Sequence, residues 1–338
     1  MRAFEFILEG GWDTTLTQGT VLKPATVGRA LKVIDQFVID FNKFLKGKGI
    51  APIQRGRPTG SSAYYEKDQV ENPDKIYGDI DLQMIAPPVE GKTQNQFTAY
   101  WNALADEFVQ SGGAPYMDTS ESKPGHPIVQ IGDNDYVQVD LMWHEPKMAD
   151  WGATRVTPEH GVKGMLSGNM YSVTGSLLDM SIQHAGVQLK VVDNQRVPFS
   201  KQKGVQLVTV TTNPKTWLLD ILKYEAQQRG IENPQIDPLL KANPGTDINN
   251  VRIANLVKGV KGLAASFEAN GMFDQGDLAK YGSAEGFLDA FKQGYTEKAM
   301  KDIESDKRSK ATTPEAKARA EDDRKKIKQG LDMVLGLF

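Results

Sequence analysis

Cysteine is absent from this chain of 338 residues. Without cysteine there is no disulfide, no thiolate zinc site and no cysteine nucleophile. Histidine is scarce as well, and the spacing of the four present does not match a pair of zinc ligands on one helix: His126, His144, His160 and His184. We therefore expect no zinc site. The lack of disulfides fits a reducing compartment, and we expect a cytoplasmic protein.

Long apolar runs are also missing, since no segment approaches the roughly 18 consecutive apolar residues of a membrane span. Glu5 and Glu9 interrupt the apolar stretch at the start of the chain, so we expect no secretory signal and no membrane partner. Neither charge sign dominates, because 40 basic and 43 acidic residues give a formal net charge of −3. This balance argues against non-specific coating of nucleic acid, but it allows a local basic groove.

The charged fraction of 25% and the apolar fraction of 39% are ordinary for a folded protein. At roughly 150 residues per domain, the length predicts about two domains. Residues 1–24 contain Gly10, Gly11, Gly19 and Pro24, and we expect an irregular segment there. We expect a first domain over residues 25–165 and a second over residues 166–338.

The pattern of the first domain alternates between helix and strand. Apolar residues recur at helical spacing from Thr26 to Lys46, which predicts a long helix. Further elements are predicted in chain order: a strand over 51–57, a strand over 78–85, a helix over 97–109 and a β-hairpin with arms 128–131 and 136–143. Residues 63–78 are polar and predict a loop with one helical turn. Together these elements predict an α+β domain.

The second domain is predicted to be mainly helical, with β-hairpin insertions. Its expected elements are a helix over 172–183, a hairpin over 187–199, a strand over 205–211, and helices over 214–229, 249–269 and 284–303. The tail from Lys301 to Phe338 mixes both charges around few apolar residues. It predicts either a solvated helix docked through Leu331, Val334, Leu335 and Phe338, or an arm that binds RNA or another partner.

Two aspartates lie on one predicted strand, in the sequence Asp79-Ile80-Asp81. Side chains of a strand alternate between its faces, so Asp79 and Asp81 point the same way while Ile80 and Leu82 point into the core. Two such carboxylates repel each other, and a divalent cation between them relieves the repulsion. This pair is the first candidate for a metal site.

A third aspartate, Asp140, lies on a later predicted strand with the sequence Val137-Gln138-Val139-Asp140-Leu141. The valines and Leu141 are expected to face the core, so Asp140 and Gln138 face the other side. If the two strands are neighbours, three carboxylates converge on one patch. That arrangement suits two Mg²⁺ or Mn²⁺ ions, which clamp the attacking and leaving oxygens in phosphoryl transfer.

A glycine–serine turn, Gly60-Ser61-Ser62, precedes the aspartates. Glycine allows close backbone approach, and the N–H and hydroxyl groups are donors for phosphate oxygens. Arg55 and Arg57 come just before the turn, and guanidinium forks match phosphate oxygens. We treat the turn and the two arginines as candidate phosphate contacts.

The order of Gly-Ser, Asp-x-Asp and a lone Asp on an apolar strand resembles the DNA polymerase β-like nucleotidyltransferase superfamily, over about residues 26–143. The resemblance implies a mixed sheet with flanking helices, followed by a mainly helical second domain. It also implies that Gly60, Ser61 and Ser62 hold a triphosphate and that Asp79 and Asp81 bind both metals. Asp140 would hold the catalytic metal and act as general base.

The same resemblance implies a reaction. An acceptor hydroxyl would attack an NTP bound with two Mg²⁺ or Mn²⁺ ions, take up the nucleoside monophosphate and release pyrophosphate. Lys163 follows the carboxylates, where the family often places a basic nucleotide contact. Residues 63–78 are a departure, because they lengthen the usual gap between the Gly-Ser turn and the first aspartate.

Several alternatives remain open at this point. The acceptor is an RNA 3′ end (as in tRNA nucleotidyltransferases), a protein side chain or a small molecule. A second possibility is an inactive nucleotidyltransferase fold used as a binding or structural module. A third is an unrelated protein in which the three aspartates lie apart.

Overall fold

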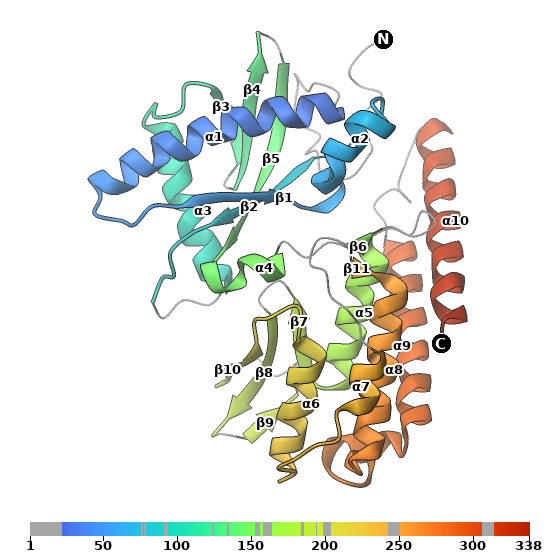
Figure 1. Ribbon diagram of the computed structural model, residues 1–338. Coiled ribbons are helices and arrows are strands. Elements are labelled where there is room, and N and C mark those ends of the chain that lie inside the picture. The colour runs from blue at the N-terminus through green and yellow to red at the C-terminus, as the bar shows by residue number, and fades with distance from the viewer. Residues whose placement is uncertain are drawn as a thin grey trace. The chain divides into compact units, whose positions relative to one another are not determined.

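The computed structural model describes residues 22–75, 77, 79–90, 94–123, 125–133, 135–152, 156–157, 164–183, 186–193, 195–198, 204–242, 251–305 and 314–338. The chain divides into two compact units, Met1–Ala153 and Thr154–Phe338 (Figure 1). Within the described ranges, the helices lack the apolar length that a membrane crossing requires. The irregular segment expected over residues 1–24 falls outside the described residues up to residue 21, and its end is helical from Pro24.

The first unit is built on a five-stranded mixed sheet with the order β1-β2-β5-β4-β3. Its strands are β1 (Gln54–Pro58), β2 (Ile80–Ile85), β3 (Met117–Lys123), β4 (His126–Gly132) and β5 (Asp135–His144). The central pair β2–β5 is parallel, and the other neighbours pair antiparallel. The predicted α+β class is therefore confirmed for this unit, and the predicted hairpin is β4–β5. Strand β3 was not predicted.

Two helices cover one face of this sheet. Helix α1 (Pro24–Gly47) lies across the strands in Figure 1, and α3 (Gln94–Gln110) is the second. Their apolar residues form one core cluster with alternate strand residues, among them Ile80, Leu82 and Met84 of β2 and Val137, Val139 and Leu141 of β5. Burial of this face leaves the residues in between, including Asp81 and Asp140, on the opposite face.

The segment between β1 and β2 is more ordered than the predicted loop. It contains the 3₁₀ helix η2 (Gly60–Tyr64) and helix α2 (Tyr65–Glu71). Most residues of α2 are exposed, and Asp68 is its buried member. The prediction of a loop with one helical turn over 63–78 is correct in containing helix but underestimates its extent. Such a short, solvated helix carries no apolar repeat for the sequence pattern to detect.

Two short elements follow β5 in the first unit. They are η3 (Pro146–Met148) and α4 (Ala149–Gly152). Gln83 of β2 donates a hydrogen bond from Nε2 to the Ala149 carbonyl at 2.6 Å. The same side chain packs against Gly56 of β1, where an added Cβ would lie 2.3 Å from Gln83 Oε1.

The second unit combines a four-stranded sheet and a separate two-stranded sheet with helices. Its strands are β6 (Val156–Thr157), β7 (Met180–Gln183), β8 (Gly186–Val192), β9 (Gln195–Val197), β10 (Gln206–Thr211) and β11 (Val251–Arg252). Strands β10, β8 and β7 lie in that order, and β9 also pairs with β8. The helical elements are α5 (Gly164–Leu177), α6 (Trp217–Gln228), α7 (Asp237–Ala242), α8 (Ile253–Ala269), η4 (Met272–Asp274), η5 (Gly276–Tyr281), α9 (Ala284–Ser305) and α10 (Pro314–Gly336).

One predicted helix of this unit was wrong in its second half. The sequence pattern predicts helix over 172–183, whereas α5 ends at Leu177 and residues 180–183 form β7. Asp179 has a left-handed φ of +47°, which ends the helix. Met180 and Ile182 are then buried in the sheet, where β7 pairs with β8.

The charged tail ends as a docked helix. Ile327, Leu331 and Val334 of α10 are buried, and the Phe338 ring lies 5.0 Å from that of Phe291 on α9. The structure therefore supports the docked alternative for the end of the chain.

Candidate active site

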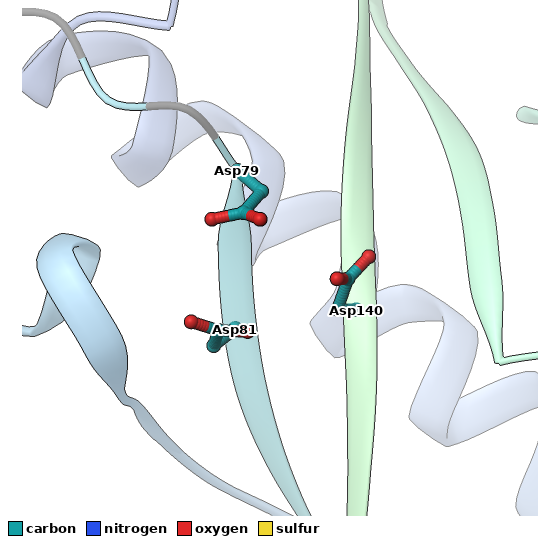
Figure 2. Close-up of side chains that lie close together, drawn as sticks. All are labelled: Asp79, Asp81 and Asp140. Carbon is teal, nitrogen blue, oxygen red and sulfur yellow. The ribbon is translucent and has the colours of Figure 1, made fainter. Parts of the chain in front are cut away.

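Three carboxylates meet on the open face of the first unit's sheet. Strands β2 and β5 are parallel neighbours, with Asp81 directly opposite Asp140, and Asp79 lies just before β2. Ligand oxygens of Asp79, Asp81 and Asp140 all lie within 4.8 Å of one another. Figure 2 shows Asp81 and Asp140 on the two neighbouring strands and Asp79 at the start of β2. The condition set by the sequence, that these strands be neighbours, is met.

The proximity of these carboxylates changes their acidity. Burial raises the pKa of Asp79 to about 7, and the negative charges of Asp81 and Asp140 add to that rise while His126 opposes it. The pKa of Asp81 is also raised, by burial first and then by Asp140, again opposed by His126. Without a cation the cluster therefore holds a proton near neutral pH, because three like charges are unfavourable in one partly buried patch.

The glycine–serine turn lies against Asp81. Gly60 has a left-handed φ of +57°, and a Cβ built on it would come within 2.1 Å of Asp81 Oδ2. The Thr59 N–H donates to the Asp81 carbonyl at 2.7 Å, which ties the start of η2 to β2. Only glycine combines this backbone conformation with so close an approach. The sequence-based pairing of this turn with the aspartates is thus seen as a direct contact.

The glycine–serine turn contains two serines, Ser61 and Ser62. Ser62 is fully buried, and its hydroxyl donates to the Thr59 carbonyl at 3.0 Å. That side chain stabilises the turn, so we leave it out of the phosphate site proposed below. The backbone of Ser61 belongs to η2, while its side chain lies outside the described part of the structure.

Asp140 receives hydrogen bonds from two further side chains. Nε2 of Gln138, two residues earlier on β5, donates to Asp140 Oδ1 at 2.7 Å. Nδ1 of His126 on β4 lies 2.7 Å from the same oxygen. The sequence placed Gln138 on the face of Asp140, and the hydrogen bond confirms it. The sequence analysis gave no role to His126, since the predicted hairpin arm began only at residue 128.

The sequence analysis predicted three basic phosphate contacts, and the structure does not bring the first of them, Arg55, to the carboxylates. Arg55 lies opposite Met84, a buried core residue of β2, and its guanidinium pairs with Asp35 of α1. It is therefore on the α1-covered face, away from Asp81 and Asp140, because the register of β1 sets its direction. Arg57 is exposed at the end of β1. Lys163 lies outside the described residues.

Comparisons with known proteins give few matches. No protein-family model matches the chain, and a search of curated proteins finds no match. Among solved structures, Leishmania infantum polymerase beta in a ternary P/T complex matches with 14% identity and a TM-score of 0.30, covering 50% of this chain and 58% of that chain. The same enzyme in a ternary gap complex matches with 14% identity and a TM-score of 0.29, covering 50% of this chain and 51% of that chain. The matched region thus spans little more than half of those chains, and a TM-score near 0.3 establishes no shared fold.

Proposed function

We propose that the protein is a nucleotidyltransferase that uses divalent cations to move a nucleoside monophosphate from an NTP to an acceptor hydroxyl. The observation that carries this proposal is the convergence of Asp79, Asp81 and Asp140, whose ligand oxygens lie within 4.8 Å of one another. The close approach of Gly60 to Asp81 supports the proposal that the turn at Gly60 binds phosphate beside the carboxylates.

The chemistry of this cluster fits a hard cation. Carboxylate oxygens are the ligands that Mg²⁺ and Mn²⁺ prefer, and oxygens on opposite sides of one Mg²⁺ are about 4 Å apart. Burial, and next the charges of the neighbouring carboxylates, raise the pKa of Asp79 and of Asp81, so a bound cation would offset an unfavourable concentration of negative charge. Asp79, Asp81 and Asp140 would hold one or two ions. Bound ions would neutralise phosphate charge and increase the acidity of the acceptor hydroxyl.

The residues of the chain have separate tasks in this reaction. The backbone N–H groups at the start of η2, around Gly60 and Ser61, would bind the triphosphate. The acceptor oxygen attacks the α-phosphorus, a new P–O bond forms, and the bond to the bridging oxygen breaks so that pyrophosphate leaves. Asp140 takes the hydroxyl proton as general base. Orientation of the two reactants supplies much of the rate enhancement.

The acceptor is proposed as an RNA 3′ end, with a protein side chain or a small molecule as the alternatives. Fold and metal site are shared by enzymes with different acceptors, so the acceptor has to be found by experiment. An inactive binding module is the remaining alternative. The presence of all three carboxylates in one cluster favours the enzyme.

A label-transfer assay tests this function. The full chain is incubated with each α-labelled NTP, Mg²⁺ or Mn²⁺, and pooled cellular RNA and protein, beside the Asp79→Asn, Asp81→Asn double variant. Label that enters one fraction only with the unchanged chain would establish the activity and identify the acceptor class. Label that persists in the double variant would contradict the proposal. Absence of both transfer and metal-dependent NTP binding would favour the inactive module.

A further inference from the structure

His126 reaches the carboxylate cluster from outside the set of residues that the sequence motifs identify. It starts β4, the strand that pairs antiparallel with β5. The pair Ile128–Gln138 in this ladder, continued by two residues, puts His126 opposite Asp140. The Leu141 N–H donates to the Gly125 carbonyl at 2.8 Å, which confirms that the register holds at this end.

An irregularity in the hairpin produces this alignment. Gly132 pairs with Asp135 at the turn, but the register shifts before Gln130, which pairs with Tyr136. Without that shift, the register set at the turn would bring the neighbour of His126 opposite Asp140. Because one residue of slip turns side chains to the other face, the bulge determines that an imidazole faces the carboxylate.

We propose that His126 is a positioning residue for Asp140: it donates a hydrogen bond from Nδ1 to Oδ1 and so presents Oδ2 to the cation. The inference rests on the proposed function and adds a residue to its site. The described hydrogen bonds from His126 and Gln138 both end on Oδ1, each at 2.7 Å. Two donors on one oxygen fix the rotation of the carboxylate about its Cβ–Cγ bond.

The chemical groups restrict how this contact works. A carboxylate only accepts hydrogen bonds, so Nδ1 carries the proton, whether the ring is neutral or charged. The Asp140 side chain is 15% exposed and that of His126 is 50% exposed. The imidazole therefore lies at the rim of the cluster, from which it orients the more buried carboxylate. Partners that orient metal ligands in this way typically change metal affinity by about 10–100-fold when removed.

Manganese binding by the full chain, without nucleotide, tests this role. Free Mn²⁺ is measured by electron paramagnetic resonance during titration of the unchanged protein and of the His126→Ala, His126→Asn and Asp79→Asn variants. Asparagine keeps a donor near the position of Nδ1, and alanine removes it. Gln130→Ala is the matched control, because Gln130 lies on the same strand and donates to the Asp133 carbonyl instead. Circular dichroism confirms that each variant is folded.

We expect His126→Ala to weaken Mn²⁺ binding by about 10-fold or more, and His126→Asn to stay within about threefold of the unchanged protein. Gln130→Ala should bind as the unchanged protein does. Should His126→Ala fail to fold, the asparagine variant and Gln138→Leu, which removes the second donor, carry the comparison. Gln138→Leu is expected to weaken Mn²⁺ binding in the same way.

A metal-free readout separates orientation from simple packing. The ¹⁵N shifts of the His126 ring should report a proton on Nδ1, and Asp140→Asn should change them. Two results would overturn the positioning role: unchanged Mn²⁺ affinity in His126→Ala, or equal loss of affinity in the alanine and asparagine variants. If Asp79→Asn abolishes binding in the same series, the metal site itself still stands. If the unchanged protein binds no Mn²⁺, the proposed function and this inference both fail.

Discussion

Gly60 and Asp81 lie in such close contact that a Cβ on Gly60 would come within 2.1 Å of Asp81 Oδ2. The glycine belongs to the turn after β1, and the aspartate belongs to β2, so two separate motifs of the sequence meet at one point. Because the φ of Gly60 is +57°, a side chain is disfavoured there both by the backbone and by the carboxylate. The position of Asp81 therefore depends on the absence of a side chain at residue 60.

Replacement of this glycine should affect metal binding more than stability. We expect Gly60→Ala to displace the Asp81 carboxylate and to weaken Mn²⁺ binding at least about tenfold, the range for a disturbed ligand shell. The left-handed backbone should lower the free energy of unfolding by about 1 kcal/mol. Mn²⁺ titration and urea denaturation measure the two effects.

Gly49 offers a matched control for this variant. Its φ is +71°, and an added Cβ would meet nothing within 4 Å. Gly49→Ala should therefore show a similar backbone cost with unchanged Mn²⁺ affinity. Equal loss of metal affinity in both variants would show that the contact with Asp81 is irrelevant.

The pKa of Asp79 predicts how the metal-free protein responds to pH. Its pKa of about 7 in the folded state lies above the ordinary value of 3.8, so the folded protein binds an extra proton between these values. Stability from this group is present below about pH 4 and is lost as pH rises through 7. In EDTA, Asp79→Asn should reduce the fall in unfolding free energy between pH 5 and pH 8 by about 2 kcal/mol.

Urea denaturation at the two pH values measures this difference, and Asp133→Asn, in the exposed β4–β5 turn, is the control. Saturating Mg²⁺ should restore the stability of the unchanged protein at pH 8 but not that of Asp79→Asn. An identical pH dependence in the unchanged protein and Asp79→Asn would mean that the carboxylates do not share a proton.

A buried hydrogen-bonded contact stabilises the segment between β1 and β2 that leads to Asp79. Asp68 of α2 accepts hydrogen bonds from Lys75 Nζ and the Tyr77 hydroxyl, each at 2.6 Å. The Tyr77 N–H donates to the Leu22 carbonyl at 2.9 Å. Tyr77→Phe removes one donor from a buried carboxylate and should lower the unfolding free energy by about 1–2 kcal/mol.

Thermal and urea unfolding of Tyr77→Phe measure this loss. Asp74→Ala is the comparison, because it removes an ion pair with Lys23 in which Asp74 is 90% exposed. That variant should unfold like the unchanged chain. An unfolding free energy of Tyr77→Phe equal to that of the unchanged chain would show that the buried hydrogen bond does not stabilise the fold.

The second unit contains a buried ion network that should be sensitive to a single change. Glu225 of α6 is 1% exposed and pairs with Arg196 and Arg229, and both arginines also pair with Asp277. Removing the charge of the buried acid leaves the two guanidinium groups with Asp277, which is 37% exposed, as the carboxylate that they share. We expect Glu225→Gln to cost about 3–5 kcal/mol of unfolding free energy.

Glu232→Gln, at an exposed position, is the control for this variant. Calorimetry compares the two proteins. A midpoint for Glu225→Gln equal to that of Glu232→Gln would rule out a stabilising role for the network.

Local spacing explains which parts of the site the sequence could predict. The alternation of a strand is enough to place Asp79 with Asp81 and Asp140 with Gln138. The parallel pairing of β2 with β5 joins residues about 60 positions apart, a long-range contact that spacing cannot specify. From the sequence, the convergence of the three carboxylates could be predicted only on the assumption that the two strands are neighbours.

Strand register explains why the sequence analysis assigned Arg55 to the site and missed His126. Arg55 lies on the face covered by α1 because it pairs with Met84, and His126 reaches Asp140 because of a bulge in the β4–β5 hairpin. In both cases a shift of one residue would reverse the side-chain direction. Such shifts depend on strand pairing, which a single sequence does not reveal.

The most direct measurement is the position of a bound cation. Crystals of the full chain are soaked in MnCl₂ with a non-hydrolysable NTP, and diffraction is recorded at the manganese absorption edge. We expect an anomalous peak within about 2.5 Å of carboxylate oxygens from Asp79, Asp81 and Asp140, with the triphosphate beside Gly60. Manganese and nucleotide bound at another place, with these three carboxylates empty, would contradict it.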